Sequence, residues 1–228
     1  PYGVTRADYA VLTETIPTSE RELPIGELRR RFSYKGRVVD GRLVGCTPEY
    51  ADVTQLKVDR GHFIEAPDVA RHENICAIAA EVANRLFPIE DPIGRSIRVE
   101  DSVYRVVGVM EPKNPTAAVG GSLAAQEFTN DVYIPITTLW SRIGDQIVTR
   151  RSGSFEGEIV ELSQVTLRVN DVSNVIETAE IVKRTLAESH RDDDYGITVP
   201  LELLEQARTT RLMFIVFMGL IAAISLVV

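Results

Sequence analysis

The sequence LMFIVFMGLIAAISLVV occupies residues 212–228, and the organisation of the whole chain is predicted from this stretch. These residues carry no charge and include one Ser and one Gly. As a helix rising ~1.5 Å per residue they would span ~25 Å, slightly less than the ~30 Å hydrocarbon core of a bilayer. A buried helix of a water-soluble protein is the alternative, but such a helix normally carries several polar positions. We therefore expect residues 204–228 to be a stalk followed by the truncated start of a transmembrane helix.

The chain as a whole has the composition of a folded globular protein. Of the 228 residues, 44% are hydrophobic and 25% are charged, and the net charge is −8. The one basic cluster, Arg29-Arg30-Arg31, lies in an expected strand, whose side chains alternate between two faces. Because the sequence has no basic face and no interleaving of aromatic and basic residues, we expect no nucleic-acid partner.

The two cysteines, Cys46 and Cys76, do not form a dense pattern of the kind that small disulfide-rich proteins use. Cys76 lies in the apolar stretch 74–79. We favour the interpretation that both are small buried apolar residues. Pairing in an oxidising compartment stays open, because thirty residues of sequence separation do not forbid it.

Hydrophobic periodicity predicts intermixed helices and strands, which defines the α+β class. Helices are expected over residues 5–15, 81–87, 137–143 and 171–189, after Thr47-Pro48, and from Pro200 onward. Strands are expected over residues 21–34, 37–45, 56–58, 74–79, 95–100, 103–110, 131–135, 159–169 and 195–199. Residues 65–73, 112–129 and 144–157 are expected to be loops. Thr5 and Asp8 have the spacing of a capping box at the start of the first helix.

We predict no catalytic, cofactor-binding or metal-binding residue in this chain. The sequence has no Gly-rich phosphate loop, so it has no nucleotide site of that kind. His62, His72 and His190 lack the spacing of metal ligands and are expected to be exposed or hydrogen-bonded residues without a chemical role.

Two further patterns are weaker than they first look. The run that begins at Asp192 has the acidic start of a calcium loop, but its twelfth position is Leu203 instead of the bidentate glutamate. Gly120-Gly121-Ser122 is followed by no Gly at the required place and is preceded by no strand, so it is not a nucleophile elbow. We interpret both as solvated loops.

Six short motifs follow one another along the chain in a characteristic order and spacing. They are Gly61-His62-Phe63, Leu86-Phe87-Pro88, Asp91-Pro92-Ile93-Gly94-Arg95-Ser96-Ile97, Tyr104-Arg105-Val106-Val107-Gly108-Val109, Asp131-Val132-Tyr133-Ile134-Pro135 and AAISLVV at residues 222–228. Jointly they resemble the periplasmic core domain of MacB-type ABC transporter permeases, within the FtsX-like permease superfamily. The last of them looks like the start of that family's second membrane helix.

The resemblance implies an extracytoplasmic domain with two lobes. A discontinuous porter-like lobe would consist of residues 1–58 and 159–203, and a mostly-β lobe, residues 59–158, would be inserted between its parts. Residues 1–203 would face the extracytoplasmic side of the bacterial cytoplasmic (inner) membrane. The stalk at residues 204–228 would then enter the lipid.

The resemblance also implies a function and partners. Members of the family are permeases that work as homodimers and are driven by a cytoplasmic ABC ATPase subunit or domain. Helix motion driven by ATP is converted into movement of the periplasmic domain, for export of a small molecule, peptide or lipoprotein. Membrane lipid is a further partner, and some members add a periplasmic adaptor protein and an outer-membrane channel. The domain itself is expected to be no enzyme and to need no cofactor.

Two functions of other classes are kept as alternatives. Arg208 and Arg211 precede the apolar run, and the positive-inside rule would place them in the cytoplasm. That reading gives a tail-anchored membrane protein with a cytosolic interaction domain. A membrane-anchored hydrolase is the second alternative, but the sequence shows no nucleophile and base at a spacing that would support it.

Overall fold

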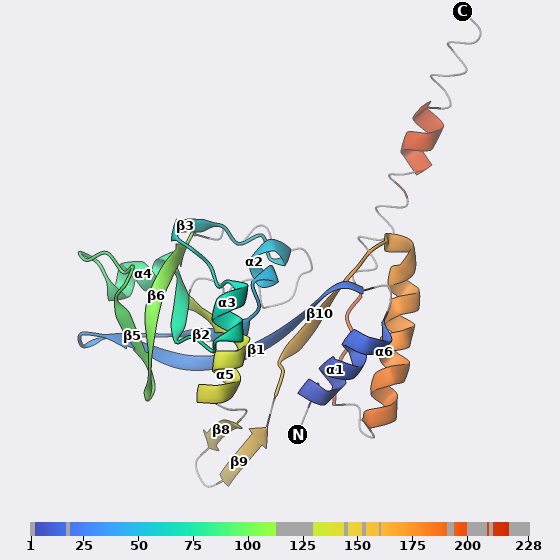
Figure 1. The fold of residues 1–228 in the computed structure, drawn as a ribbon. Coiled ribbons are helices and arrows are strands. Elements are labelled where there is room, and N and C mark those ends of the chain that lie inside the picture. Colours follow the sequence, from blue (N-terminus) through green and yellow to red (C-terminus); the bar gives the residue numbers. More distant parts are fainter. Residues whose placement is uncertain are drawn as a thin grey trace, which may run out of the picture.

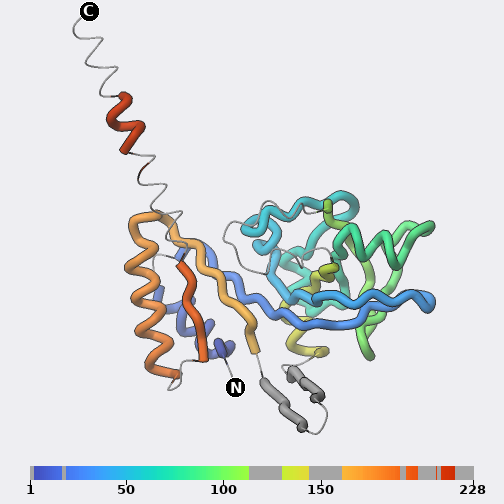
Figure 2. The backbone as a smooth tube through the Cα atoms, turned by 180° about the vertical axis from the view of Figure 1, so that it is seen from behind, coloured from blue at the N-terminus to red at the C-terminus, as the bar shows by residue number. Residues whose placement is uncertain are grey.

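The computed structural model describes residues 3–16, 19–112, 130–143, 146–151, 154–159, 161–190, 194–199, 209 and 212–218. A ring of strands with short helices around it lies on one side, and two packed helices lie on the other (Figure 1). One long strand, β1, runs from the helices into the ring. The view from behind shows the same two parts joined by β1 and its neighbour β10 (Figure 2).

The described elements alternate between helices and strands along the chain. The helices are α1 (Arg6–Thr15), α2 (Glu49–Val53), α3 (Ala66–Ala70), α4 (Ala80–Leu86), α5 (Ile136–Arg142) and α6 (Val175–Ser189), with a 3-10 turn at Val172–Asn174. The strands are β1 (Ser19–Tyr34), β2 (Arg37–Cys46), β3 (Val58–Gly61), β4 (Ile75–Ala79), β5 (Ser96–Val99), β6 (Ser102–Met110), β7 (Asp131–Pro135), β8 (Gln146–Arg151), β9 (Ser154–Ile159) and β10 (Gln164–Val169).

The main sheet closes on itself to form a barrel. Its strands follow the order β1-β2-β7-β4-β6, and β5 closes the ring because it pairs with both β6 and β1. The pairs β2–β7 and β4–β6 are parallel, and the other pairs of the ring are antiparallel. Two strands extend the sheet beyond the ring: β3 pairs with β6, and β10 pairs with β1.

Strand β1 belongs to both parts of the structure. Its first half, Ser19 to Ile25, pairs with β10, which lies beside the α1 and α6 helices. Its second half, Gly26 to Tyr34, pairs with β2 inside the ring. One continuous strand of sixteen residues therefore runs through both parts, with hydrogen-bonded neighbours along both of its halves.

A closed apolar core fills the barrel. Each strand of the ring contributes a fully buried side chain to one cluster: Phe32, Leu43, Ile78, Ile97, Val106 and Val132. Helices α4 and α5 pack on the same cluster through Val82 and Leu139. Because side chains alternate along a strand, Val44 and Tyr133 point to the opposite face, where they meet α2 through Tyr50.

Three of the motifs quoted for the family resemblance meet on β6. A Cβ atom built at Gly108 would lie 2.1 Å from the carbonyl oxygen of His62, and one at Gly61 would lie 2.0 Å from that of Val107. Gly61 also has a φ of +76°. Only glycine therefore lets β3 and β6 approach this closely. The turn that ends at Gly94 joins them, because its amide donates to Val106.

A smaller core lies between α1 and α6. Leu12 and Ile16 pack against Val182 and Leu186, and Tyr195 covers one end. The apolar stripe predicted for residues 171–189 is confirmed as the buried face of α6.

The predicted α+β class is confirmed, and so is the burial of both cysteines. Cys46 and Cys76 are free and completely buried, and burial raises the pKa of each thiol. The predicted capping box at Thr5 and Asp8 is also present.

The following local predictions were wrong. The strand expected over residues 159–169 is not continuous, because residues 161–163 lie outside the strands and β10 begins at Gln164. Residues 65–73 contain helix α3, which begins with a second capping box between Glu65 and Asp68. Residues 144–157 contain most of the β8–β9 hairpin, whose strands pair antiparallel. Residues 195–199 do not form a strand. Periodicity reports which residues suit a strand, whereas a strand forms only where a neighbour supplies hydrogen bonds. Residues 113–129 of the loop predicted over 112–129, and the helix start predicted at Pro200, lie outside the described residues.

Candidate functional site

The helical part of the domain carries a buried polar cluster where α1 begins and α6 ends. The imidazole of His190 lies between two carboxylates, with Nε2 3.0 Å from Oδ2 of Asp8 and Nδ1 2.8 Å from Oδ1 of Asp194. The side chains of the three residues are 9%, 7% and 15% exposed. We refer to these three residues as the His190 clasp.

Each carboxylate of the His190 clasp also accepts hydrogen bonds from groups other than His190. Asp8 accepts hydrogen bonds from the amide and hydroxyl of Thr5, at 2.8 and 2.6 Å, and from the hydroxyl of Ser189 at 2.8 Å. Asp194 accepts one from the amide of Gly3 at 3.1 Å. The clasp therefore joins the segment before α1, the end of α6 and the segment that follows α6.

These surroundings stabilise the charged form of each group. Burial acts to raise the pKa of Asp8, but hydrogen bonds from Thr5, His190 and Ser189 lower it to about 2. The hydrogen bond to Asp8 raises the pKa of His190 above its ordinary value of 6.5, and it outweighs the opposing effect of burial. Burial likewise acts to raise the pKa of Asp194, but the Gly3 amide and the charge of His190 lower it.

A second buried polar cluster lies in the barrel, where β1, β2 and β7 run side by side. The guanidinium of Arg42 donates two hydrogen bonds to Asp131, at 3.1 and 2.7 Å, and one to Glu27 at 3.0 Å. Tyr133 also donates to Asp131, whose side chain is fully buried. Burial acts to lower the pKa of Arg42, but hydrogen bonding to Asp131 and the nearby carboxylates raise it above its ordinary value.

Two contacts join the helical part to the barrel beside β1. The guanidinium of Arg6 lies over the ring of Trp140, 4.6 Å from its centroid. Ser163 makes two hydrogen bonds to β1. Its backbone amide donates to the carbonyl of Ile25, and its hydroxyl oxygen accepts from the amide of Glu27. A cation over an indole ring contributes about 0.5–2 kcal/mol, so this junction adds modestly to the pairing of β1 with β10.

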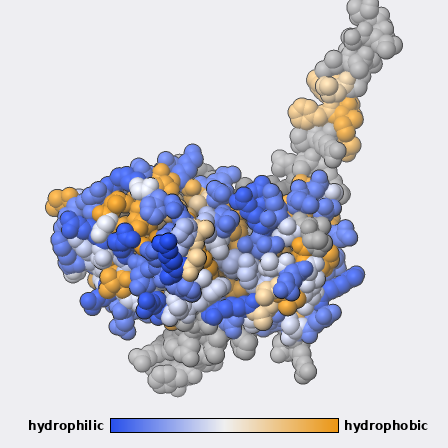
Figure 3. Space-filling model, viewed as in Figure 1, coloured by the Kyte–Doolittle hydropathy of each residue, from blue (hydrophilic) through white to orange (hydrophobic). Residues whose placement is uncertain are grey.

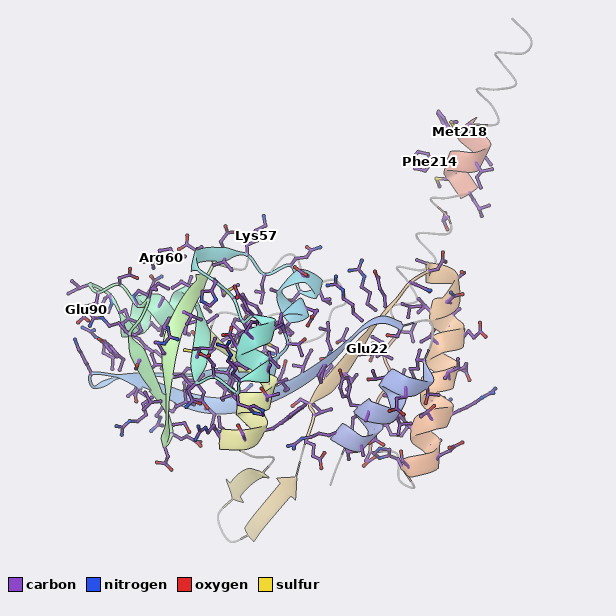
Figure 4. The ribbon with its side chains drawn as sticks, in the orientation of Figure 1. Glu22, Lys57, Arg60, Glu90, Phe214 and Met218 are labelled. Atoms are coloured by element: carbon purple, nitrogen blue, oxygen red, sulfur yellow. The ribbon has the colours of Figure 1, made fainter. Side chains whose placement is uncertain are left out.

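The apolar run at the end of the chain is exposed where the structure describes it. Residues 212–218 are helical, and all seven side chains are between 59% and 70% exposed. Phe214 and Met218 project from the same side of this helix, and each is 67% exposed (Figure 4). In the space-filling view the helix is an apolar segment that stands apart from a mostly polar face (Figure 3).

Within the described residues, no helix combines the length and the apolar character that crossing a bilayer requires. The predicted continuation of the apolar helix over residues 219–228 lies outside them.

The histidines considered in the sequence lie in separate surroundings. His62 contacts the carbonyl of Phe63, and His72 lies 3.4 Å from that of Thr137, with both rings partly exposed. Within the described ranges, no three His, Cys, Asp or Glu side chains are arranged to hold a metal. Residues 120–122 and 192–193 lie outside those ranges.

The His190 clasp was not predicted from the sequence. Asp8 and His190 are 182 positions apart, so no local pattern connects them. The available signals were the capping box at Asp8 and the spacing of four between His190 and Asp194. Neither signal says that the two meet.

The architecture is that of an α+β domain in which a closed barrel is joined by one long strand to a pair of helices. Residues 2–185 match the family described as "MacB-like periplasmic core domain". This match covers most of the chain, so the chain belongs to that family, and the resemblance predicted from the motifs is confirmed.

Relatives of known identity match over part of their length. The macrolide export ATP-binding/permease protein MacB of Azoarcus is 30% identical over 179 residues, which are 78% of this chain and 24% of that protein. The pyoverdine export ATP-binding/permease protein PvdT of Pseudomonas aeruginosa is 23% identical, over 100% of this chain and 32% of that protein. The chain thus spans about a quarter to a third of the length of these relatives.

Two solved structures share the fold. The periplasmic region of MacB from Actinobacillus actinomycetemcomitans has a TM-score of 0.67 at 17% identity, covering 91% of this chain and 84% of that one. The extracellular domain of the ABC-type transporter YknZ from Gram-positive bacteria has a TM-score of 0.62 at 17% identity, covering 84% of this chain and 86% of that one. At this level of identity the likeness establishes the fold alone.

Proposed function

We propose that this chain is the extracytoplasmic domain of an ABC transporter permease that converts ATP-driven motion of membrane helices into movement outside the membrane. The observation that carries the proposal is a MacB-like periplasmic core domain followed in the same chain by an exposed apolar helix at residues 212–218. Burying one large apolar side chain is favourable by about 1.5–3 kcal/mol. Seven exposed apolar side chains in succession therefore favour insertion into lipid.

The lobed organisation is part of this proposal. The sequence predicted lobe boundaries at residues 58 and 159, and these stay predictions. We propose a different position for the first boundary, inside β1 near Gly26. Support comes from the change of partner there, from β10 to β2. The porter-like lobe would then contain α1, β10, α6 and residues 194–199, and β1 would be a stiff connection shared with the barrel lobe.

The partners follow from the proposed role. A cytoplasmic ABC ATPase subunit or domain supplies the energy, a second permease completes a homodimer, and lipid surrounds the helix that begins near residue 212. The relatives are named for export of macrolides and of pyoverdine, and we propose export of a small molecule, peptide or lipoprotein for this chain. A periplasmic adaptor protein and an outer-membrane channel complete the path in this proposal, and the domain itself catalyses no reaction.

The side of the membrane on which the domain lies tests the proposal. Ile89 is 91% exposed and adjoins Glu90, which lies at the end of the barrel farthest from α6 (Figure 4). Because Cys46 and Cys76 are buried, a thiol introduced by Ile89→Cys is the reactive one. In the membrane-expressed protein, we expect a membrane-impermeant thiol reagent to label it once any outer membrane is permeabilised and while the inner membrane is intact.

The unsubstituted protein is the control, and it should stay unlabelled because its thiols are enclosed. If Ile89→Cys is labelled only after the inner membrane is lysed, the domain is cytosolic. That result would overturn the proposal in favour of a tail-anchored protein with a cytosolic interaction domain.

A further inference from the structure

We propose that the His190 clasp is a pH-sensitive latch, in which a protonated imidazole ties the N-terminal segment to the chain that leaves α6. The three residues come from three different segments, and the clasp is buried at the end of the small core between α1 and α6. Along the sequence, the segment that follows α6 precedes the exposed helix at residues 212–218. The latch therefore lies on the path between the domain and the apolar helix.

The geometry selects the protonated form of His190. A neutral imidazole has one N–H donor and one acceptor, whereas an imidazolium has two donors. Nε2 of His190 is hydrogen-bonded to Oδ2 of Asp8 at 3.0 Å, and Nδ1 lies 2.8 Å from Oδ1 of Asp194 in an ion-pair contact that is not aligned as a hydrogen bond. An ionised carboxylate is an acceptor only. A neutral His190 would turn a lone pair toward Asp8 or Asp194. One of the two connections is then lost.

The other groups around the imidazole do not replace the missing proton. Asp8 keeps its partners on α1 and α6, because Thr5 and Ser189 donate to it whatever the state of His190. Asp194 has the amide of Gly3, and the ring of Tyr195 lies 5.3 Å from that of His190. Asp194 is the less supported carboxylate, so it is the connection expected to open. Residues 191–193, which carry further charges, lie outside the described part of the chain.

The direction of the pH dependence follows from linkage. The folded protein raises the pKa of His190 above 6.5, so the clasp stabilises the folded form fully below pH 6.5. That stabilisation is lost as the pH rises through the folded-state pKa. By the same relation, each unit by which the pKa of His190 in the latched form exceeds its pKa in the released form corresponds to about a tenfold change in the equilibrium between those two forms.

The consequence for transport rests on the proposed function. The solution outside the cytoplasmic membrane follows the pH of the medium more closely than the cytoplasm does. With the latch closed, motion of the apolar helix reaches α1 and α6 together. With the latch released at alkaline pH, the same motion is absorbed in residues 194–199, and export falls.

Nuclear magnetic resonance of the imidazole groups tests the latch directly in the full chain held in lipid nanodiscs. We expect His190 to titrate above pH 6.5, and Asp194→Asn to lower its midpoint while keeping an acceptor for the Gly3 amide. The matched control is Glu65→Gln, which removes an exposed carboxylate 3.9 Å from His62 and should leave the His190 midpoint unchanged. A His190 midpoint that Asp194→Asn does not lower would overturn the proposal.

A distance measurement tests whether protonation moves the chain. Spin labels on Val11→Cys in α1 and Ile197→Cys after α6 occupy positions that are 48% and 40% exposed. Electron paramagnetic resonance should give a narrow distribution of distances between the two labels at pH values below the titration midpoint of His190. Above that midpoint the distribution should be broad. The same distribution on both sides, with circular dichroism unchanged, would rule the latch out.

The His190 titration and the spin-label distance are both measured without ATP and without transport. The titration of His190 in the unsubstituted protein can be measured even if a variant fails to fold. The two proposals therefore fail separately. Suppose that His190 titrates as expected but that Ile89→Cys is labelled only from the cytosolic side. That combination would overturn the proposed function and leave the latch intact.

Discussion

Arg42 and Asp131 are opposite each other in the parallel pair of β2 and β7, and they are largely removed from solvent. Removing one partner of such a pair leaves an uncompensated buried charge, which costs about 3–5 kcal/mol. We expect Arg42→Met to lower the free energy of unfolding by roughly that amount, because the fully buried carboxylate of Asp131 loses the guanidinium that neutralises it. Urea denaturation of the full chain in detergent, followed by circular dichroism, measures it.

Arg31 provides the matched control for this prediction. It also joins β1 to β2, through Asp40 at 3.1 Å, but both side chains are more than 70% exposed. Exposed pairs contribute only about 0–1 kcal/mol, so Arg31→Met should have little effect. The double variant Arg42→Met/Asp131→Leu should recover much of the loss because no buried charge is left unpaired. Equal losses for Arg31→Met and Arg42→Met would contradict the assignment of a buried ion pair.

At the scale of an element, the helix from residue 201 onward is predicted to be continuous and to act as a stiff rod between membrane and domain. The structure describes helix at residues 209 and 212–218, and residues 201–208 lie outside it. Replacing Glu205, Gln206 and Ala207 with three glycines would cost roughly 2–3 kcal/mol of local helix stability. In the complete transporter we expect ATP hydrolysis to continue and export to fail.

Alanine is the matched substitution for the rod, because it removes the same side chains and favours the helix. A transporter with Glu205→Ala and Gln206→Ala, which keeps the native Ala207, should export at the parental rate. If the triple-glycine transporter also exports at that rate, displacement does not pass through a continuous helix, and the rod mechanism is wrong.

At the scale of the whole molecule, the proposal separates the source of energy from the domain that moves. The sequence has no Gly-rich phosphate loop, so we expect this chain to bind no ATP. Isothermal titration calorimetry of the purified chain with magnesium and ATP should give no saturable heat. The cytoplasmic ATPase partner, titrated in the same way, is the positive control. Tight magnesium-dependent binding by this chain would contradict the prediction.

Local patterns in the sequence predicted the features that depend on neighbours a few positions away. The stripe on α6, the capping box at Thr5 and the burial of Cys76 follow from periodicity and from residue type. The family followed from short motifs in a fixed order. Three of those motifs meet on β6, where Gly61 and Gly108 permit a close approach of two strands. Their order in the sequence thus reflects a contact in space.

The tertiary structure alone decided which distant residues meet. Nothing near Ser96 or Val99 in the sequence says that β5 closes the barrel by pairing with β1, because closure depends on the twist and register of the whole ring. The same holds for Arg42 with Asp131 and for Asp8 with His190, which are 89 and 182 positions apart. Hydrogen bonds act over about 3 Å, so a pair distant in sequence forms only after the chain has brought its elements together.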